Sequence, residues 1–273
     1  MQYDPIKRTL GKVFNSTPLL RVLFYKMLDV LLLRSWHIAR ELDKWNASCG
    51  DEGKDILDAG CGFGQYSHRL WSLNEKHRVR GVDVKQEQMD DCNVFFDKIG
   101  AKTVDFRVED LTTYVEKERK YDLVLSVDVM EHILEDRKVF DNFYAMMKEG
   151  AMLLISTPSD KGGSDNCHHD EDEAHGFIDE HVRDGYGIED ITEKLKSAGF
   201  KRVEARYTYG TPGHISWLLS MKAPILMLNA SKIFFIVLPF YYLAVMPWCL
   251  LLNLWDLYGT HEEGTGLLVK AVK

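Results

Sequence analysis

Residues 56–67 read ILDAGCGFGQYS. A short apolar run leads into Asp58, and Gly60, Gly62 and Gly64 then alternate with other residues before a helical pattern begins. Glycines at such a turn let the backbone fold tightly and approach a ligand with no Cβ in the way. The N-terminus of the following helix suits the carboxylate of a bound amino-acid moiety. The spacing differs from the dinucleotide pattern GxGxxG, because the third glycine comes one residue sooner and an aspartate precedes the set.

Short apolar segments alternate with helical ones around this loop. We expect strands at residues 55–59, 79–83, 104–107, 121–127, 151–156, 202–207 and 266–272, and helices at 65–73, 86–99, 137–148 and 188–198. Apolar strands that alternate with helices are typical of a parallel sheet covered on both faces. The sequence therefore predicts an α/β fold.

The glycine loop resembles the first motif, DxGxGxG, of the class I methyltransferases that use S-adenosylmethionine (SAM). The resemblance covers roughly residues 54–207 and the last ten residues. It implies a Rossmann-like, seven-stranded sheet with helices on both faces. It also implies that Asp58 orients the amino group of SAM, that Asp83 accepts from the ribose hydroxyls, and that Asp110 accepts from the adenine amino group. The cofactor-binding residues that it implies are Asp58, Gly60, Cys61, Gly62, Gly64, Asp83, Val84, Asp110, Leu111 and Val127.

A carboxylate-rich segment, DVMEH, follows the fourth expected strand. With Asp136 it is close to an xEHxxD sequence that many class I methyltransferases carry, with one residue more before the aspartate, and it resembles the ubiquinone-pathway O-methyltransferases. On a helical turn Asp128, Glu131 and His132 would share one face and bind a divalent cation such as Mg²⁺. The alternative is that Glu131 and His132 shape the cofactor pocket. His132 is also a candidate catalytic residue.

The loop after the fifth strand, residues 159–187, is expected to cap the active site. It is acidic and contains His168, His169, His175 and His181. If the methyl acceptor is a hydroxyl, a histidine is suited to take its proton. His181, which lies in a run resembling class I cap sequences, is our first candidate for this base, and His175 is the second. A zinc site at Cys167, His168 and His169 lacks the usual paired spacing.

Two segments are unusually apolar outside the expected sheet. Between residues 18 and 45 apolar residues recur at helical spacing, which predicts one or two amphipathic helices acting as a lid, a membrane-surface element or both. Residues 233–255 form a run of 23 uncharged residues. Strands of one sheet are expected before and after this run in the sequence. A chain that entered a membrane here would therefore have to return to the same side of the membrane. We therefore expect a re-entrant or interfacial hairpin with residues 214–229 as its other arm, broken or kinked at Pro224, Pro239 and Pro247. A buried subdomain or a dimer interface is the alternative.

These features divide the chain into N-terminal helices (1–48), a SAM-binding core (49–212), the apolar hairpin (213–259) and a last strand (260–273). The net charge of −8 argues against a nucleic-acid partner. Residues 1–40 nevertheless hold seven Lys or Arg against two Asp, which suits an anionic lipid surface. Five scattered cysteines fit reduced thiols in the cytosol. The sequence thus predicts a methyltransferase for a lipophilic small molecule, with O-methylation favoured, at the cytoplasmic face of a membrane. A soluble enzyme that dimerises through the hairpin and a non-catalytic SAM-binding protein are the alternatives.

Overall fold

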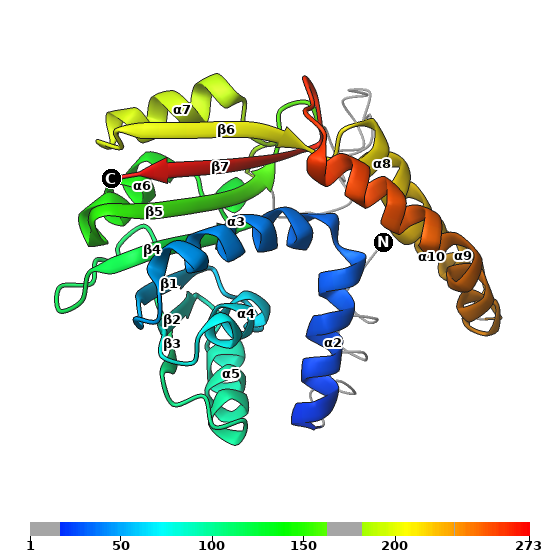
Figure 1. Cartoon of the computed structure of the whole chain (residues 1–273), viewed down its shortest axis with the longest axis horizontal. Helices are drawn as coiled ribbons and strands as arrows, with labels where there is room; N and C mark the ends of the chain where they lie inside the picture. The colour runs from blue at the N-terminus through cyan, green and yellow to red at the C-terminus, as the bar shows by residue number, and fades with distance from the viewer. Residues whose placement is uncertain (1–16, 163–181, 232) are drawn as a thin grey trace.

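The computed structural model describes residues 17–162, 182–231 and 233–273. Its seven strands form one sheet in the order β3-β2-β1-β4-β5-β7-β6, in which β7 alone runs antiparallel to its neighbours (Figure 1). The strands are β1 (Asp55–Ala59), β2 (Arg78–Asp83), β3 (Val104–Val108), β4 (Tyr121–Val127), β5 (Met147–Pro158), β6 (Arg202–Thr208) and β7 (Gly266–Val272). The seven-stranded methyltransferase sheet expected from the sequence is confirmed.

Helices pack on both faces of this sheet. The helices of the core and the N-terminal region are α2 (Pro18–Leu31), α3 (Leu33–Cys49), α4 (Gln65–Leu73), α5 (Gln86–Lys98), α6 (Asp136–Met146) and α7 (Ile188–Ser197). One apolar cluster joins the sheet to α3, α4 and α5, and another joins it to α6 and α7. The helix expected at 137–148 ends earlier, because Met147 already pairs with Tyr121 of β4.

The order of the strands fixes where a ligand can bind. The chain runs from β1 to β2 and β3 on one side of β1, and then crosses to β4 on its other side, so the direction of the connections reverses at β1. Open α/β sheets bind ligands at the carboxyl ends of the strands where this reversal occurs. The glycine loop follows β1 and the DVMEH segment follows β4, so both lie at this place.

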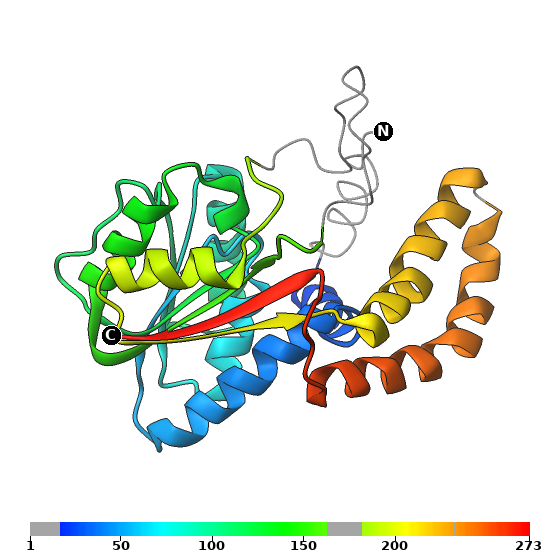
Figure 2. The same ribbon diagram turned by 90° about the horizontal axis from the view of Figure 1, so that it is seen from above.

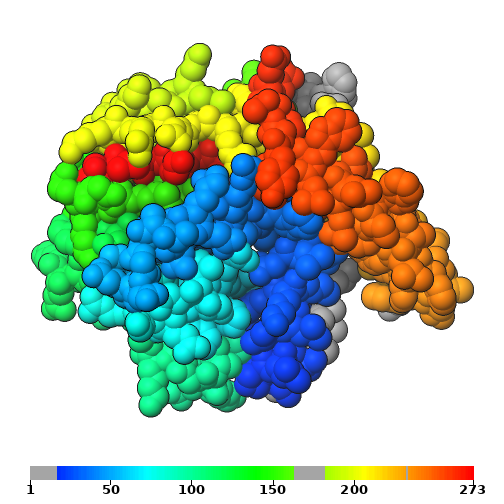
Figure 3. All heavy atoms as spheres, viewed as in Figure 1, coloured from blue at the N-terminus to red at the C-terminus, as the bar shows by residue number. Residues whose placement is uncertain are grey.

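A helical hairpin is inserted between β6 and β7. Its first arm is α8 (Thr211–Trp217), the π-helical turn η2 (Leu218–Lys222) and α9 (Ala223–Ala230), and its second arm is α10 (Phe234–Tyr258). Thr208 pairs directly with Gly266, so the hairpin leaves and re-enters the sheet at one point. Figures 2 and 3 show it extending away from the body of the molecule.

The prolines of the hairpin do not break it. Pro239 and Pro247 lie inside α10, which continues over 25 residues and curves in Figure 2. Pro224 follows the π-helical turn and has no amide hydrogen for a carbonyl in the turn before it. The hydroxyls of Tyr241 and Tyr242 donate instead to the carbonyls of Leu219 and Ser220, at 2.7 and 2.9 Å. The two expected arms are present. Pro239 and Pro247 do not end α10, and near Pro224 the two tyrosine hydroxyls supply hydrogen bonds to the carbonyls before it.

Candidate active site

The glycine loop has the backbone that the sequence predicts. Gly60, Gly62 and Gly64 have φ angles of 76°, 52° and 81°, in the region that other residues rarely adopt. A Cβ on Gly60 would lie 2.2 Å from the Val129 side chain, so this glycine is required for packing. A Cβ on Gly62 would meet no atom within 4 Å. The loop therefore presents bare backbone on an uncovered side at Gly62.

Asp58 is buried near the end of β1, next to this loop. Its Oδ2 accepts a hydrogen bond from Ser67 Oγ at 2.6 Å. Burial disfavours the charged form and raises the pKa of Asp58 to about 7, and the nearby charge of Asp83 acts in the same direction. A cationic amino group placed beside this carboxylate would be strongly stabilised, because no other cation contributes to its pKa.

Asp83 and Asp110 lie at the ends of the next two strands. Asp83 accepts from Gly62 N at 3.0 Å and from Lys85 N at 3.2 Å, which connects the loops after β1 and β2. Asp110 accepts from the amide and hydroxyl of Thr112, and these bonds lower its pKa. The neighbouring amide of Glu109 donates to the Asp83 carbonyl.

The predicted cofactor residues therefore come together along one edge of the sheet. Val84 is exposed beside Asp83, Leu111 and Cys61 are buried beneath the loops, and Val127 is half-buried at the end of β4. A carboxylate for an amino group, bare backbone at a glycine turn and a carboxylate at the end of β2 suit the amino-acid and ribose parts of SAM. These donors and acceptors fit SAM.

The metal hypothesis for Asp128, Glu131 and His132 is wrong for this structure. Asp128 has a left-handed φ of 52° and lies before the 3₁₀ turn η1 (Met130–His132), so the three do not share a helical face. Asp128 forms an ion pair with Arg34 of α3. Glu131 is buried and accepts from Thr157 Oγ1 at 3.1 Å, whereas His132 is exposed. Across residues 17–162, 182–231 and 233–273 no cluster of three potential metal ligands exists.

Asp136 of the same motif has a structural role. It accepts hydrogen bonds from Arg183, Tyr186 and Lys194, and these ion pairs and hydrogen bonds lower its pKa despite the effect of burial. The amide of Val182 donates to the Glu131 carbonyl at 3.1 Å. The motif thus fixes the end of the 159–187 cap to the core. His175 and His181, with Cys167, His168 and His169, lie outside the described residues.

A polar group that the sequence analysis missed lies beside Asp128. Arg34 pairs with Asp128, its backbone amide donates to the Tyr209 hydroxyl at 3.0 Å, and its positive charge lies near Tyr66. Burial and, to a smaller extent, the Asp128 carboxylate raise the pKa of Glu131 to about 8. Arg34 lies 94 residues from Asp128, so spacing alone gives no signal for this contact.

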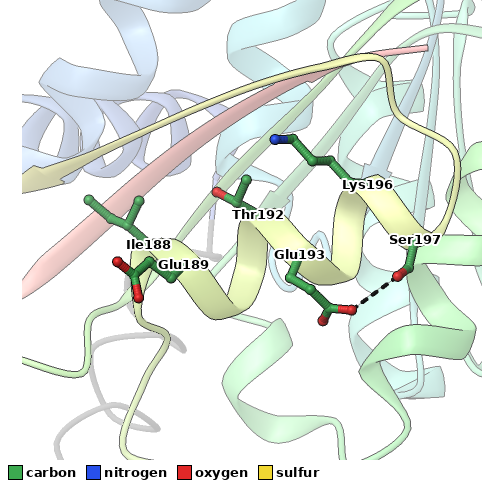
Figure 4. Close-up of a pocket in the computed structure, with 6 residues that line it drawn as sticks. All are labelled: Ile188, Glu189, Thr192, Glu193, Lys196 and Ser197. Carbon is green, nitrogen blue, oxygen red and sulfur yellow. Dashed lines mark hydrogen bonds between the residues drawn. The ribbon is translucent and has the colours of Figure 1, made fainter.

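One surface hollow lies away from this edge. It has a volume of about 650 Å³ and is lined by residues of α7 alone, as Figure 4 shows: Ile188, Glu189, Thr192, Glu193, Lys196 and Ser197. None of them belongs to the loops after β1, β2, β3 or β4. The hollow is a feature of an exposed helix, and we assign it no ligand.

Comparison with known proteins identifies the family of the chain. A family model described as a methyltransferase domain matches residues 50–206. Malonyl-[acyl-carrier protein] O-methyltransferase 2 of Ilyobacter polytropus is 30% identical over 108 residues, which are 39% of this chain and 40% of that protein. Phosphoethanolamine N-methyltransferase 1 of Zea mays is 29% identical over 154 residues, which are 56% of this chain and 29% of that protein. The chain thus spans less than half the length of either relative.

A solved structure shares the fold. Phosphoethanolamine N-methyltransferase 2 of Haemonchus contortus, in complex with phosphomonomethylethanolamine and S-adenosylhomocysteine, superposes with a TM-score of 0.57 at 20% identity. The superposition covers 84% of this chain and 52% of the other.

Proposed function

Because the chain belongs to the class I SAM-dependent methyltransferase family, we propose that it transfers a methyl group from SAM to a lipophilic small molecule at the cytoplasmic face of a membrane. A hydroxyl is the first choice of acceptor and an amine the second. The relatives named above include one O-methyltransferase and one N-methyltransferase, so they do not decide between the two.

One observation carries the membrane part of this proposal. Among the described residues α10 is the one helix long and apolar enough to cross a bilayer, yet only 6% of its most apolar window is buried. Its outward side chains include Phe235, Ile236, Phe240, Leu243, Trp248, Leu251 and Trp255. Leaving a large apolar side chain in water costs about 1.5–3 kcal/mol relative to burying it. A hydrocarbon interior would remove that cost, and tryptophan suits its polar boundary.

The connections of the hairpin favour an element that enters one leaflet over a single crossing. Both arms join the sheet at the Thr208–Gly266 pair, so the chain returns to the side from which it came. The carboxyl ends of the parallel strands point toward the side on which the hairpin lies (Figure 1). An acceptor dissolved in the bilayer would then reach the cofactor edge without crossing water.

The residues of this chain provide binding and orientation. When bound, SAM supplies an electrophilic methyl group on a sulfonium. Asp58 and Asp83 would hold the amino and ribose groups, and the glycine loop would set the position of the methionine portion. For a hydroxyl acceptor we keep His181 and then His175 as candidate bases. Replacing the base with glutamine should lower kcat more than KM and abolish the acidic limb of its pH profile.

The test is transfer of labelled methyl from SAM into a total lipid extract of the source cell and, separately, into its water-soluble metabolites. Label in the organic phase supports the proposal, and mass spectrometry then distinguishes a methyl ether from a methylamine. Label in the aqueous phase alone would reject the lipophilic acceptor. Flotation of the protein with vesicles tests the membrane part separately, and a concentration-dependent mass without flotation would assign the hairpin to dimerisation.

A further inference from the structure

Helix α2 carries apolar side chains on two faces. Val22 and Phe24 pack against the core beside the buried Arg21 and Tyr25, and a second apolar stripe is exposed. Leu19 and Leu23 are 79% and 56% exposed, and Met27 and Val30 continue the same stripe at helical spacing. Surface helices of soluble proteins normally turn such a stripe inward. Among the described residues, nothing apolar therefore covers the outer face of α2.

The inner face of α2 is fixed to the glycine loop. Arg21 Nη2 and the Tyr25 hydroxyl both donate to the Phe63 carbonyl, at 2.8 and 2.5 Å. Arg21 Nη1 also contacts Asp91 of α5 at 2.6 Å, and its guanidinium lies 4.4 Å from the centre of the Phe95 ring. Phe63 stands between Gly62 and Gly64, so α2 holds the loop that carries the predicted methionine site.

Charge points to a lipid surface as the partner of the outer face. Lys26 is exposed beside the stripe. The sixteen residues that precede Thr17, the N-cap of α2, contain Lys7, Arg8 and Lys12 against a single acid, Asp4. Basic residues next to an apolar helical face are the pattern of helices that lie on anionic bilayers. Figure 1 shows α2 on the side of the sheet where the hairpin also lies.

We propose that the apolar stripe of α2 docks on an anionic bilayer and that the bilayer thereby holds α2 over the glycine loop, so that SAM binds more tightly to the membrane-bound protein. The inference rests on the membrane placement in the proposed function. Its physical basis is linkage: a surface that binds α2 only when α2 is packed on the glycine loop stabilises every ligand that needs this packing. By reciprocity SAM strengthens binding to vesicles.

The decisive variant is Leu23→Asp, which places a charge on the stripe. Leu23 is already more than half exposed, so the fold should tolerate the change, and thermal melting checks this. Val94→Asp on α5 is the matched control, because Val94 is 53% exposed and outside the stripe. SAM affinity is measured by equilibrium dialysis without vesicles, with phosphatidylcholine vesicles, and with vesicles that also contain phosphatidylserine.

We expect anionic vesicles to tighten SAM binding by at least about fivefold for the unchanged protein and for Val94→Asp. Leu23→Asp should keep the vesicle-free affinity and lose this gain. If the unchanged protein does not float with vesicles, the membrane placement itself fails. If it floats but Leu23→Asp keeps the full gain, only the docking of α2 is overturned. A dimer that Leu23→Asp converts to a monomer would assign the stripe to a second copy of the chain and overturn the inference.

Discussion

Strand β1 and helix α10 both carry large apolar side chains, but these side chains meet opposite environments. All five residues of β1 are buried, and its aspartates have hydrogen-bonding or ionic partners. Most of α10 is exposed, and its buried residues gather toward its C-terminal end. The core covers its own apolar side chains, whereas among the described residues much of the apolar surface of α10 stays uncovered. Apolar composition therefore indicates burial, but it does not say what will cover the surface.

The largest effect is expected where these two regions join. Asp256 of α10 is fully buried and accepts from His37 Nε2 at 2.9 Å and from the amides of Gly213 and Tyr209 at 3.1 and 3.2 Å. Burial lowers the pKa of His37, so it donates as a neutral imidazole at pH 7. Asp256→Ala should lower the free energy of unfolding by about 3–5 kcal/mol, because buried donors lose their partner.

Urea denaturation measures this loss, and Asp256→Asn is the control, since it keeps one acceptor oxygen and should lose less. If Asp256→Ala detached the hairpin while the core unfolded at its usual urea concentration, the hairpin and the core would be two independently stable domains.

The next effect separates cofactor binding from membrane binding. Asp83→Ala removes the acceptor for Gly62 N together with the predicted ribose contacts. Two charge-assisted hydrogen bonds correspond to about 3 kcal/mol, or roughly a hundredfold in SAM affinity. The far-ultraviolet spectrum and flotation with vesicles should not change. Unchanged SAM affinity would contradict the assignment of Asp83.

The sequence predicted those parts of the fold that local patterns determine. Short apolar segments of the sequence predicted the positions of β1, β4 and β7. The glycine spacing predicted the turn after β1, which has positive φ angles. The partner of Asp128 could not be predicted, because it depends on a left-handed turn and on Arg34 from a distant helix. The burial of Arg21 and Tyr25 in α2 could not be predicted either, because their partner, the Phe63 carbonyl, lies on the distant glycine loop.

A smaller effect concerns the pH dependence of the core site. The pKa of Asp58 is about 7 without a ligand, and a cationic amino group would stabilise its charged form. SAM binding should therefore release a proton, and affinity should rise as the pH increases through 7. Between pH 6 and pH 8 the gain is about tenfold, set by the fraction of Asp58 already ionised. Asp58→Asn should remove this dependence while leaving any contribution of the ligand's own ionisation, and an identical profile in the variant would exclude Asp58.

The smallest effect tests whether the hairpin, like the core, hydrogen-bonds its own backbone carbonyls. Tyr242 donates to the Ser220 carbonyl near Pro224, which supplies no amide hydrogen. Tyr242→Phe keeps the ring and removes this bond, so the free energy of unfolding in detergent micelles should fall by about 1 kcal/mol. Tyr258→Phe is the control, because Tyr258 is exposed and its contact with Arg40 is made by the ring. If only Tyr242→Phe lowered the free energy of unfolding, the Ser220 carbonyl would lie away from water. The hairpin would then already satisfy the carbonyl that a bilayer could not hydrogen-bond. Equal values for the two variants would mean that water still reaches Ser220, and the seam of the hairpin would then lie outside the bilayer.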